Sequence, residues 1–127
     1  MRSAALSELT TLRLGGPAAR LVTIDDEEAL VDAVRTADDA DEPLLLLAGG
    51  SNVVVADAGF DGTAARVVTR GVEGIRMGDG RVRLNVAAGE HWDGFVAACV
   101  ADGLAGVEAL SGIPGSVGAP PIQNVGA

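Results

Sequence analysis

The chain has 127 residues, enough for one domain or for one lobe of a larger domain. Its net charge is −9 and its nine cationic residues are all arginine, which disfavours nucleic acid and anionic membranes as partners and excludes a Walker-type phosphate loop, since that loop needs a lysine. One cysteine and one histidine are too few for a disulfide framework or for a zinc site of the usual kinds.

The first elements expected along the chain are a strand, a helix and a second strand. Residues 19–24 read as a strand, and Asp25 follows as an N-cap, with Glu28 three positions later to complete a capping box. Helical spacing then gives the next segment an apolar face made of Leu30, Val31, Val34 and Ala37. This helix has to end before Pro43, and the apolar run at residues 44–48 predicts a buried strand.

Further strands and a second helix are expected downstream. The strands are predicted at residues 53–56, 65–69, 75–77 and 81–87. Gly-Asp-Gly at residues 78–80 marks a tight hairpin between the last two. The second helix is predicted from residue 90 to residue 102, with Gly103 as its C′ residue. Its buried stripe consists of Trp92, Phe95, Val96, Cys99 and Val100.

From Ser111 onward the texture of the sequence changes. This last segment holds three of the five prolines and four glycines, with little periodicity. It therefore predicts an ordered loop that is neither strand nor helix. Strands covered by two helices make the expected fold α+β.

The Gly-Gly-Ser-Asn at residues 49–52 is the first segment that carries chemistry. It follows a predicted strand directly, and its glycines leave the backbone open to close approach and to positive φ. Successive N–H groups in such a turn form an anion-binding nest, for which a pyrophosphate is a sensible guest. The alternative is a hairpin turn that simply needs glycine.

Residues 112–127 form the second such segment. Glycines permit close backbone approach there, while Pro114, Pro120 and Pro121 stiffen the path of the chain. A stiff, neutral loop of this kind suits the edge of a flat heteroaromatic ring. A rigid connector between subdomains is the alternative.

Four segments, in order along the chain, resemble a single enzyme family. They read TTLRLGGPA, LLLLAGGSNVVVAD, AAGEHWDGFV and LSGIPGSVGAPPIQNVGA, and the last is the most distinctive. Over essentially its whole length the chain is similar to the UDP-N-acetylmuramate dehydrogenases, also called UDP-N-acetylenolpyruvoylglucosamine reductases. It departs from them at Thr10 or Thr11, where asparagine is usual, and at Pro120, where a small residue is usual.

The resemblance implies an FAD-binding domain of the vanillyl-alcohol-oxidase (PCMH) type, built from two small α/β subdomains at about residues 1–60 and 61–127. It implies that one loop grips the FAD pyrophosphate, through Gly49, Gly50, Ser51, Asn52 and the amide of Val53. It implies that a second loop lies along the flavin and its ribityl chain, through Ile113, Pro114, Gly118, Ala119, Ile122 and Gly126.

The family's reaction moves a hydride from NADPH through FAD to UDP-N-acetylglucosamine enolpyruvate, giving UDP-N-acetylmuramate for peptidoglycan synthesis. By resemblance, the substrate-binding domain and the serine and acidic residue that assist the chemistry lie downstream of residue 127. The chain is therefore expected to hold FAD without catalysing the reaction alone, and we assign it no catalytic residue. A non-redox nucleotide-binding module, a fragment of another flavoprotein of this type, and a scaffold that binds nothing are the alternatives.

The remaining polar and aromatic residues are expected to have structural roles. His91 is interpreted as a surface or capping residue, Trp92 and Phe95 as core, and Cys99 as a small apolar residue. Arg66, Arg70 and Arg76 could reach a phosphate, but exposed positions on strands explain these arginines equally well. The first ten residues hold no apolar run of signal-peptide length, so we expect a cytoplasmic protein.

Overall fold

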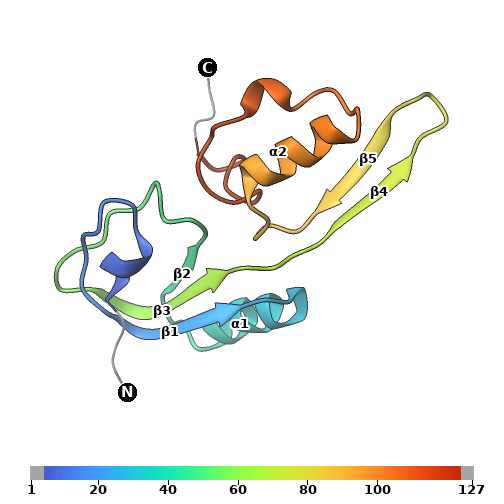
Figure 1. Cartoon of the computed structure of the whole chain (residues 1–127). Helices are drawn as coiled ribbons and strands as arrows, with labels where there is room; N and C mark the ends of the chain where they lie inside the picture. The colour runs from blue at the N-terminus through green and yellow to red at the C-terminus, as the bar shows by residue number, and fades with distance from the viewer. Residues whose placement is uncertain (1–4, 124–127) are drawn as a thin grey trace. The chain divides into compact units, whose positions relative to one another are not determined.

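The computed structural model describes residues 5–123 and separates into two compact units, divided between Val68 and Thr69. Unit 1 contains η1 (Leu6–Leu9), β1 (Ala18–Ile24), α1 (Glu27–Asp39), β2 (Leu44–Leu47) and β3 (Phe60–Val67). Unit 2 contains β4 (Val72–Arg76), β5 (Val82–Val86), α2 (Trp92–Ala101) and η2 (Glu108–Leu110) (Figure 1). The mixture of helices and strands agrees with the expected fold. The division falls later than residue 60, because β3 pairs with strands of unit 1.

Unit 1 is a three-stranded parallel sheet with the strand order β1–β3–β2, and α1 packs against β1 and β3. The central strand is therefore the last in sequence. β3 begins at Phe60, five residues before the predicted start at residue 65. The prediction was wrong there because Asp61-Gly62 resembles a turn. Gly62 is instead required inside the strand, since a Cβ at this position would lie 2.2 Å from the carbonyl oxygen of Pro43.

The two strands predicted around the Gly-Gly-Ser-Asn segment have different outcomes. β2 exists, but as an edge strand in which Leu46 is 50% exposed and Leu47 is buried. The predicted strand at residues 53–56 was wrong, because this segment has no ladder partner and follows an irregular path. Its inside–outside alternation is real, with Val54 72% exposed and Val55 buried, but alternation alone does not make a strand.

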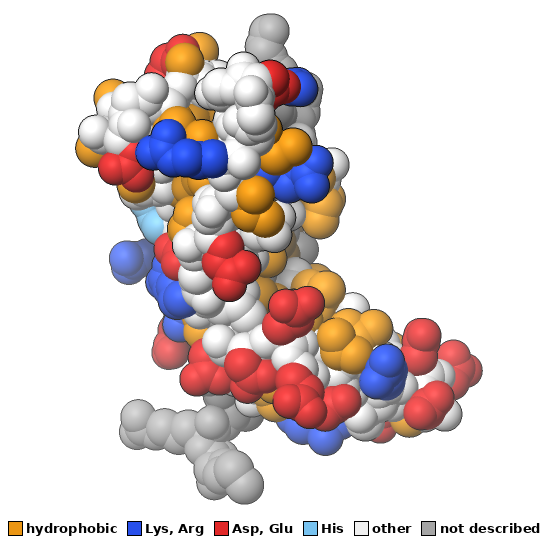
Figure 2. Space-filling model, turned by 90° about the vertical axis from the view of Figure 1, so that its right-hand side faces the viewer, with side chains coloured by type: hydrophobic (Ala, Val, Ile, Leu, Met, Phe, Trp, Pro, Cys, Tyr) orange, Lys and Arg blue, Asp and Glu red, His pale blue; other side chains and the backbone are white. Residues whose placement is uncertain are grey.

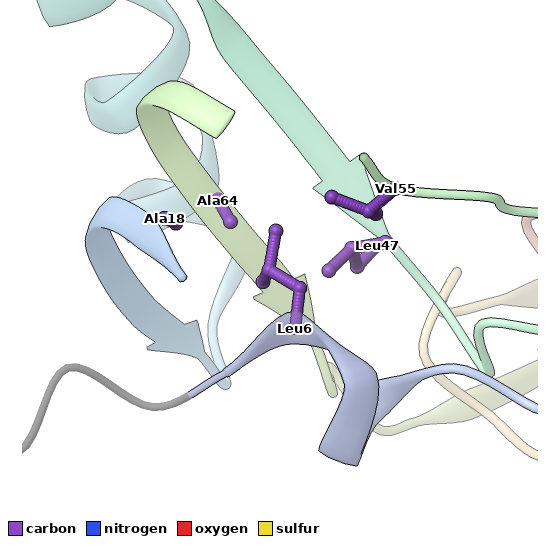
Figure 3. Packing of buried hydrophobic residues seen from close by; sticks show 5 residues of the cluster. All are labelled: Leu6, Ala18, Leu47, Val55 and Ala64. Atoms are coloured by element: carbon purple, nitrogen blue, oxygen red, sulfur yellow. The ribbon is translucent and has the colours of Figure 1, made fainter. Parts of the chain in front are cut away.

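One apolar cluster fixes the segments that surround the sheet. It consists of Leu6, Ala18, Leu47, Val55 and Ala64. Figure 3 shows these side chains facing one another from η1, β1, β2, the connection after β2, and β3. Two of them bracket the Gly-Gly-Ser-Asn segment, because Leu47 precedes it and Val55 follows it. Both ends of that loop are thus held in the core.

The start of α1 corrects a detail of the sequence prediction. The N-cap is Asp26, whose Oδ1 accepts a hydrogen bond from the N–H of Ala29 at 2.7 Å. Asp25 precedes the cap, and Glu28 therefore does not occupy the capping-box position. The predicted apolar face is partly confirmed. Ala37 is buried and Leu30 half-buried, while Val31 and Val34 are more than one third exposed.

Both helices end in the same hydrogen-bonded motif with different residues at its left-handed position. In α2, Leu104 N–H donates to the Cys99 carbonyl at 2.8 Å, and Gly103 at φ +71° confirms the predicted C′ residue. In α1, Glu42 N–H donates to the Ala37 carbonyl at 2.9 Å, and the C′ residue is Asp41 at φ +51°. An aspartate there is strained and places a negative charge at the negative end of the helix dipole.

The variant Asp41→Gly should therefore raise the free energy of unfolding by about 1 kcal/mol. Urea denaturation followed by circular dichroism measures the change. The reciprocal variant Gly103→Asp serves as control and should lower stability by a similar amount. A loss of stability in Asp41→Gly would contradict this account of the α1 terminus.

Unit 2 consists of a β-hairpin, α2 and a long irregular segment. β4 and β5 pair antiparallel with Arg76 opposite Val82, and the predicted turn at residues 78–80 is confirmed. The turn is closed by Asp79, which accepts hydrogen bonds from the backbone and side chain of Arg81. These bonds hold the pKa of Asp79 below its ordinary value. As predicted, the chain from Ser111 to Gln123 contains neither helix nor strand.

Acidic side chains dominate part of the surface. Residues 25–42 carry half of the chain's 18 acidic residues, all of them exposed, and one arginine. Figure 2 shows acidic side chains gathered on the lower part of the view. Separately, no helix within residues 5–123 is long and apolar enough to cross a membrane.

Candidate functional site

The Gly-Gly-Ser-Asn segment belongs to the connection that joins two parallel strands. Parallel strands require a crossover of about a dozen residues, which in most proteins contains a helix. Here the crossover between β2 and β3, residues 48–59, is irregular throughout. The segment therefore stands at the carboxyl end of β2, the edge where open α/β sheets bind ligands.

Four successive backbone amides of this loop have no hydrogen-bond acceptor in the described part of the protein. Within residues 5–123, the N–H groups of Gly49, Gly50, Ser51 and Asn52 donate no hydrogen bond. The hydroxyl of Ser51 and the carboxamide of Asn52 have no protein partner among the same residues. Because Gly50 is buried, an unpaired amide there is costly unless another group accepts from it. We call these four residues the amide cluster.

The glycine at position 50 has a structural reason that sequence reasoning missed. Its φ is +72°, and a Cβ built on it would lie 1.9 Å from the carbonyl oxygen of Leu9. The carbonyl of Gly50 accepts a hydrogen bond from Thr11 N–H at 2.9 Å. Close packing against the N-terminal segment thus requires glycine here.

The second predicted loop is held by the first turn of α2. Trp92 N–H donates to the Gly115 carbonyl at 3.0 Å, and Trp92 Nε1 donates to the Leu110 carbonyl at 2.9 Å. Asp93 Oδ1 accepts from Ser111 Oγ and from Gly112 N–H, both at 2.8 Å. These contacts hold the beginning of the loop, residues 110–115, against the first turn of α2.

The residues predicted to line the flavin differ in what they can offer. Gly118 and Ala119 use their N–H groups internally, donating to the carbonyls of Ala88 and Ser116. A Cβ at Gly118 would lie 2.8 Å from the Cβ of Ala88, so packing explains this glycine. Any contact of either residue with a ligand therefore uses other atoms than its N–H.

The other residues predicted to line the flavin are partly or largely exposed to solvent. Ile113 is half-buried, Pro114 is exposed, and Ile122 is 88% exposed. Gly126 lies outside the described residues. In the first loop Val53 is half-buried. The two predicted groups belong to different units, residues 49–53 to unit 1 and residues 113–122 to unit 2.

Asp93 provides a pH-dependent test of the second loop. Its hydrogen bonds from Gly112 and then from Ser111 hold the pKa of its carboxyl below the ordinary value of 3.8. The carboxylate therefore stabilises this turn fully above that value, and the stabilisation is lost as the pH falls through the lowered pKa. We expect the Gly112 amide proton resonance to titrate with a midpoint below 3.8. In Asp93→Asn this titration should disappear, and its persistence would contradict the assignment.

The structure confirms the roles predicted for His91, Trp92 and Cys99, but the predicted buried stripe of α2 was wrong at Val100, which is 55% exposed. His91 is exposed and caps α2, its Nδ1 accepting from Gly94 N–H at 3.3 Å. Trp92 is buried, and its ring lies 5.9 Å from that of the half-buried Phe95. Burial raises the pKa of the Cys99 thiol, with a smaller contribution from Asp102, which suits an apolar core residue better than a nucleophile.

The arginines considered as phosphate contacts are all exposed, but one of them is already engaged. Arg70 pairs with Glu90 at 3.4 Å, while no ion pair involves Arg66 or Arg76 among the residues that the structure describes. An open depression of about 440 Å³ in unit 1 lies away from the amide cluster. It includes the ion pair Arg20–Glu42 (3.1 Å), whose charges are mutually satisfied.

The amide cluster fits the diphosphate of a dinucleotide cofactor. Four unpaired N–H groups and a hydroxyl supply donors, and no carboxylate lies among residues 48–56 to repel an anion. Donor sets of this kind bind phosphate oxygens without needing a positive side chain. The anion-binding role of the first loop stays a prediction that its unpaired amides suit, and its glycines serve packing as well.

Comparison with known proteins gives a consistent picture. Residues 18–127 match the family model described as FAD binding domain. The chain is 59% identical over 123 residues to UDP-N-acetylenolpyruvoylglucosamine reductase of Saccharopolyspora erythraea, covering 97% of this chain and 34% of that protein. It is 57% identical over 127 residues to the reductase of the same name from Streptomyces coelicolor, covering 100% and 32%.

A solved structure shares the fold. The crystal structure of UDP-N-acetylenolpyruvylglucosamine reductase from Thermus caldophilus superposes with a TM-score of 0.72 and 30% identity. The match covers 98% of this chain and 42% of that one. The resemblance seen in the sequence is thereby confirmed, and the chain spans about a third of the length of the curated relatives that it matches.

Proposed function

Because this chain belongs to the FAD binding domain family, we propose that its amide cluster holds the diphosphate of FAD. The observation that carries this proposal is the run of unpaired N–H groups from Gly49 to Asn52, whose two ends are anchored in the core by Leu47 and Val55. Anchoring reduces the entropy lost on binding, since the loop is already ordered. The amide of Val53 continues the same run and is included in the proposal.

We assign the second loop, held by α2, to the flavin and its ribityl chain. Ile113, Pro114 and Ile122 contribute apolar side chains, and Gly118, Ala119 and Gly126 contribute backbone surface. The contacts of Trp92 and Asp93 support this assignment, because they fix the path of the loop before it meets a ligand. A largely apolar loop whose path is already fixed orients a flat ring by packing against it, without needing hydrogen bonds to the ring.

The complete protein to which such a chain corresponds is proposed to act in peptidoglycan precursor synthesis, in the cytoplasm. The chemistry that FAD supplies there is hydride transfer from NADPH to the enolpyruvyl double bond of UDP-N-acetylglucosamine enolpyruvate. The relatives are about three times as long as this chain, and the groups that protonate the product are proposed to lie in their further length. The chain alone is therefore assigned cofactor binding without turnover.

Reconstitution with FAD tests the proposal. The purified chain is incubated with FAD, separated from free cofactor by gel filtration, and examined for visible flavin absorbance. Retained flavin, with no oxidation of NADPH in the presence of the enolpyruvyl substrate, is the expected result. Binding of ADP with no preference for FAD would favour a non-redox nucleotide module, and turnover by the chain alone would contradict the assignment of catalysis to further residues.

A further inference from the structure

Arg13 adopts a backbone conformation that few arginines adopt. Its φ is +55°, and it is one of two non-glycine residues with positive φ in the described part of the chain. The other, Asp41, is explained by its place at the end of α1. No helix ends at Arg13. Instead a tight turn imposes the conformation, with Arg13 N–H donating to the Thr10 carbonyl at 3.2 Å and Thr10 Oγ1 donating to the Leu14 carbonyl at 3.4 Å.

The segment that carries Arg13 runs beside the crossover that carries the amide cluster. Thr11 N–H donates to the Gly50 carbonyl and Gly16 N–H to the Ala56 carbonyl, both at 2.9 Å. Between these two contacts, a Cβ at Gly15 would lie 2.6 Å from the Cβ of Val55. The segments therefore advance in the same direction with nearly constant offset. Along the chain, Arg13 lies between these contacts on its segment, as residues 51–54 do on the crossover.

The positive charge of Arg13 has no partner within residues 5–123. The residue is exposed, and within residues 5–123 its guanidinium makes neither an ion pair nor a hydrogen bond. The chain as a whole carries a charge of −9, which opposes the approach of a diphosphate. A cation close to a bound anion offsets such repulsion locally.

We propose that Arg13 is a specificity-determining residue that supplies the positive charge for a diphosphate bound at the amide cluster. The inference rests on the proposed function, since it takes the cluster to be the diphosphate site. The left-handed turn costs stability and belongs to the segment that contacts the crossover carrying the four unpaired N–H donors. Amides and guanidinium together recognise the phosphate charge that distinguishes FAD and ADP from riboflavin.

Three ligands and three variants of the chain test this role. Binding of FAD, ADP and riboflavin is measured by titration calorimetry for the unchanged chain, Arg13→Ala, Arg13→Gly and the control Arg35→Ala. Arg35 is also exposed and has no ion pair among the described residues, but it lies on α1. Both Arg13 variants should bind FAD and ADP about tenfold more weakly, with riboflavin affinity unchanged, and Arg35→Ala should match the unchanged chain.

Arg13→Gly separates a binding role from a structural one. Glycine adopts φ +55° without strain, so the urea midpoint of this variant should equal or exceed that of the unchanged chain while FAD affinity falls. Unchanged FAD affinity in both Arg13 variants would overturn the inference and leave the proposed function standing. An equal loss of riboflavin affinity would also overturn it. Failure of the unchanged chain to bind FAD or ADP would overturn both.

Discussion

Replacing Gly50 by alanine should destabilise unit 1 by about 3 kcal/mol or more and weaken FAD binding at least roughly tenfold. A Cβ at this position would lie 1.9 Å from the carbonyl oxygen of Leu9 and 3.0 Å from the Cα of Thr10. Both contacts are with backbone atoms, so no side-chain rotation relieves them. The loop has to move away from the N-terminal segment, and the amide cluster moves with it.

Gly103→Ala is the matched control for this variant. Gly103 has φ +71°, almost the value at Gly50, but no heavy atom in the described structure lies within 4 Å of an added Cβ. The control should therefore cost only the conformational part, about 1 kcal/mol, and leave FAD affinity unchanged. Urea denaturation and FAD titration compare the two. Equal losses of unfolding free energy in Gly50→Ala and Gly103→Ala would show that the contact with Leu9 does not constrain the loop.

Leu47→Ala should lower the free energy of unfolding by about 3 kcal/mol and weaken FAD binding as well. Leu47 is 1% exposed and is one of the two largest fully buried side chains in the described structure. Removing most of its side chain leaves a cavity among η1, β3 and the crossover. It also removes the side chain that anchors the start of the Gly-Gly-Ser-Asn loop in the core.

The neighbouring variant Leu46→Ala isolates the effect of burial. Leu46 lies on the same edge strand and loses the same atoms, but it is 50% exposed. Its cost should be about 1 kcal/mol or less, with FAD affinity unchanged. Thermal and urea unfolding of both variants measure the difference. Similar losses from the two substitutions would show that the core cluster does not hold the loop as described.

Local patterns in the sequence predicted the elements whose cause is local. Helical spacing identified α2, and Gly103 marked its end, because both signals arise within one or two turns of the chain. The hairpin at residues 78–80 was predictable for the same reason, since the turn residues determine the pairing. The N-cap of α1 was missed by one position, because Asp25 and Asp26 have the same capping group.

Features set by distant contacts were not predictable. The first half of β3, residues 60–64, was missed, although the strand predicted at residues 65–69 overlaps its second half; the buried Ala64 packs closely there without a strong strand signal. Residues 53–56 carry a strong strand signal, but the segment has no partner strand to complete a ladder. In both places tertiary pairing decided the outcome against local propensity.

The candidate site shows the same division. The residue types of Gly-Gly-Ser-Asn were sufficient to suggest an anion nest, which stays a prediction, and the structure adds that its four amides are unpaired within residues 5–123. The hydrogen bond from the Gly118 N–H to the Ala88 carbonyl was not predictable, because these two residues lie thirty positions apart in the sequence. Arg13 and Asp93 were missed as well. Neither a positive φ nor a carboxylate that closes a distant turn leaves a signal in one sequence.

Amide chemical shifts recorded during titration test most directly whether the amide cluster holds a diphosphate. FAD and ADP should each shift the N–H resonances of Gly49, Gly50, Ser51 and Asn52 downfield, as expected when an anion accepts from them. Riboflavin, which has no phosphate, should leave these four resonances in place. If FAD bound while those resonances stayed unchanged, the diphosphate would lie elsewhere and the amide cluster would not be its site.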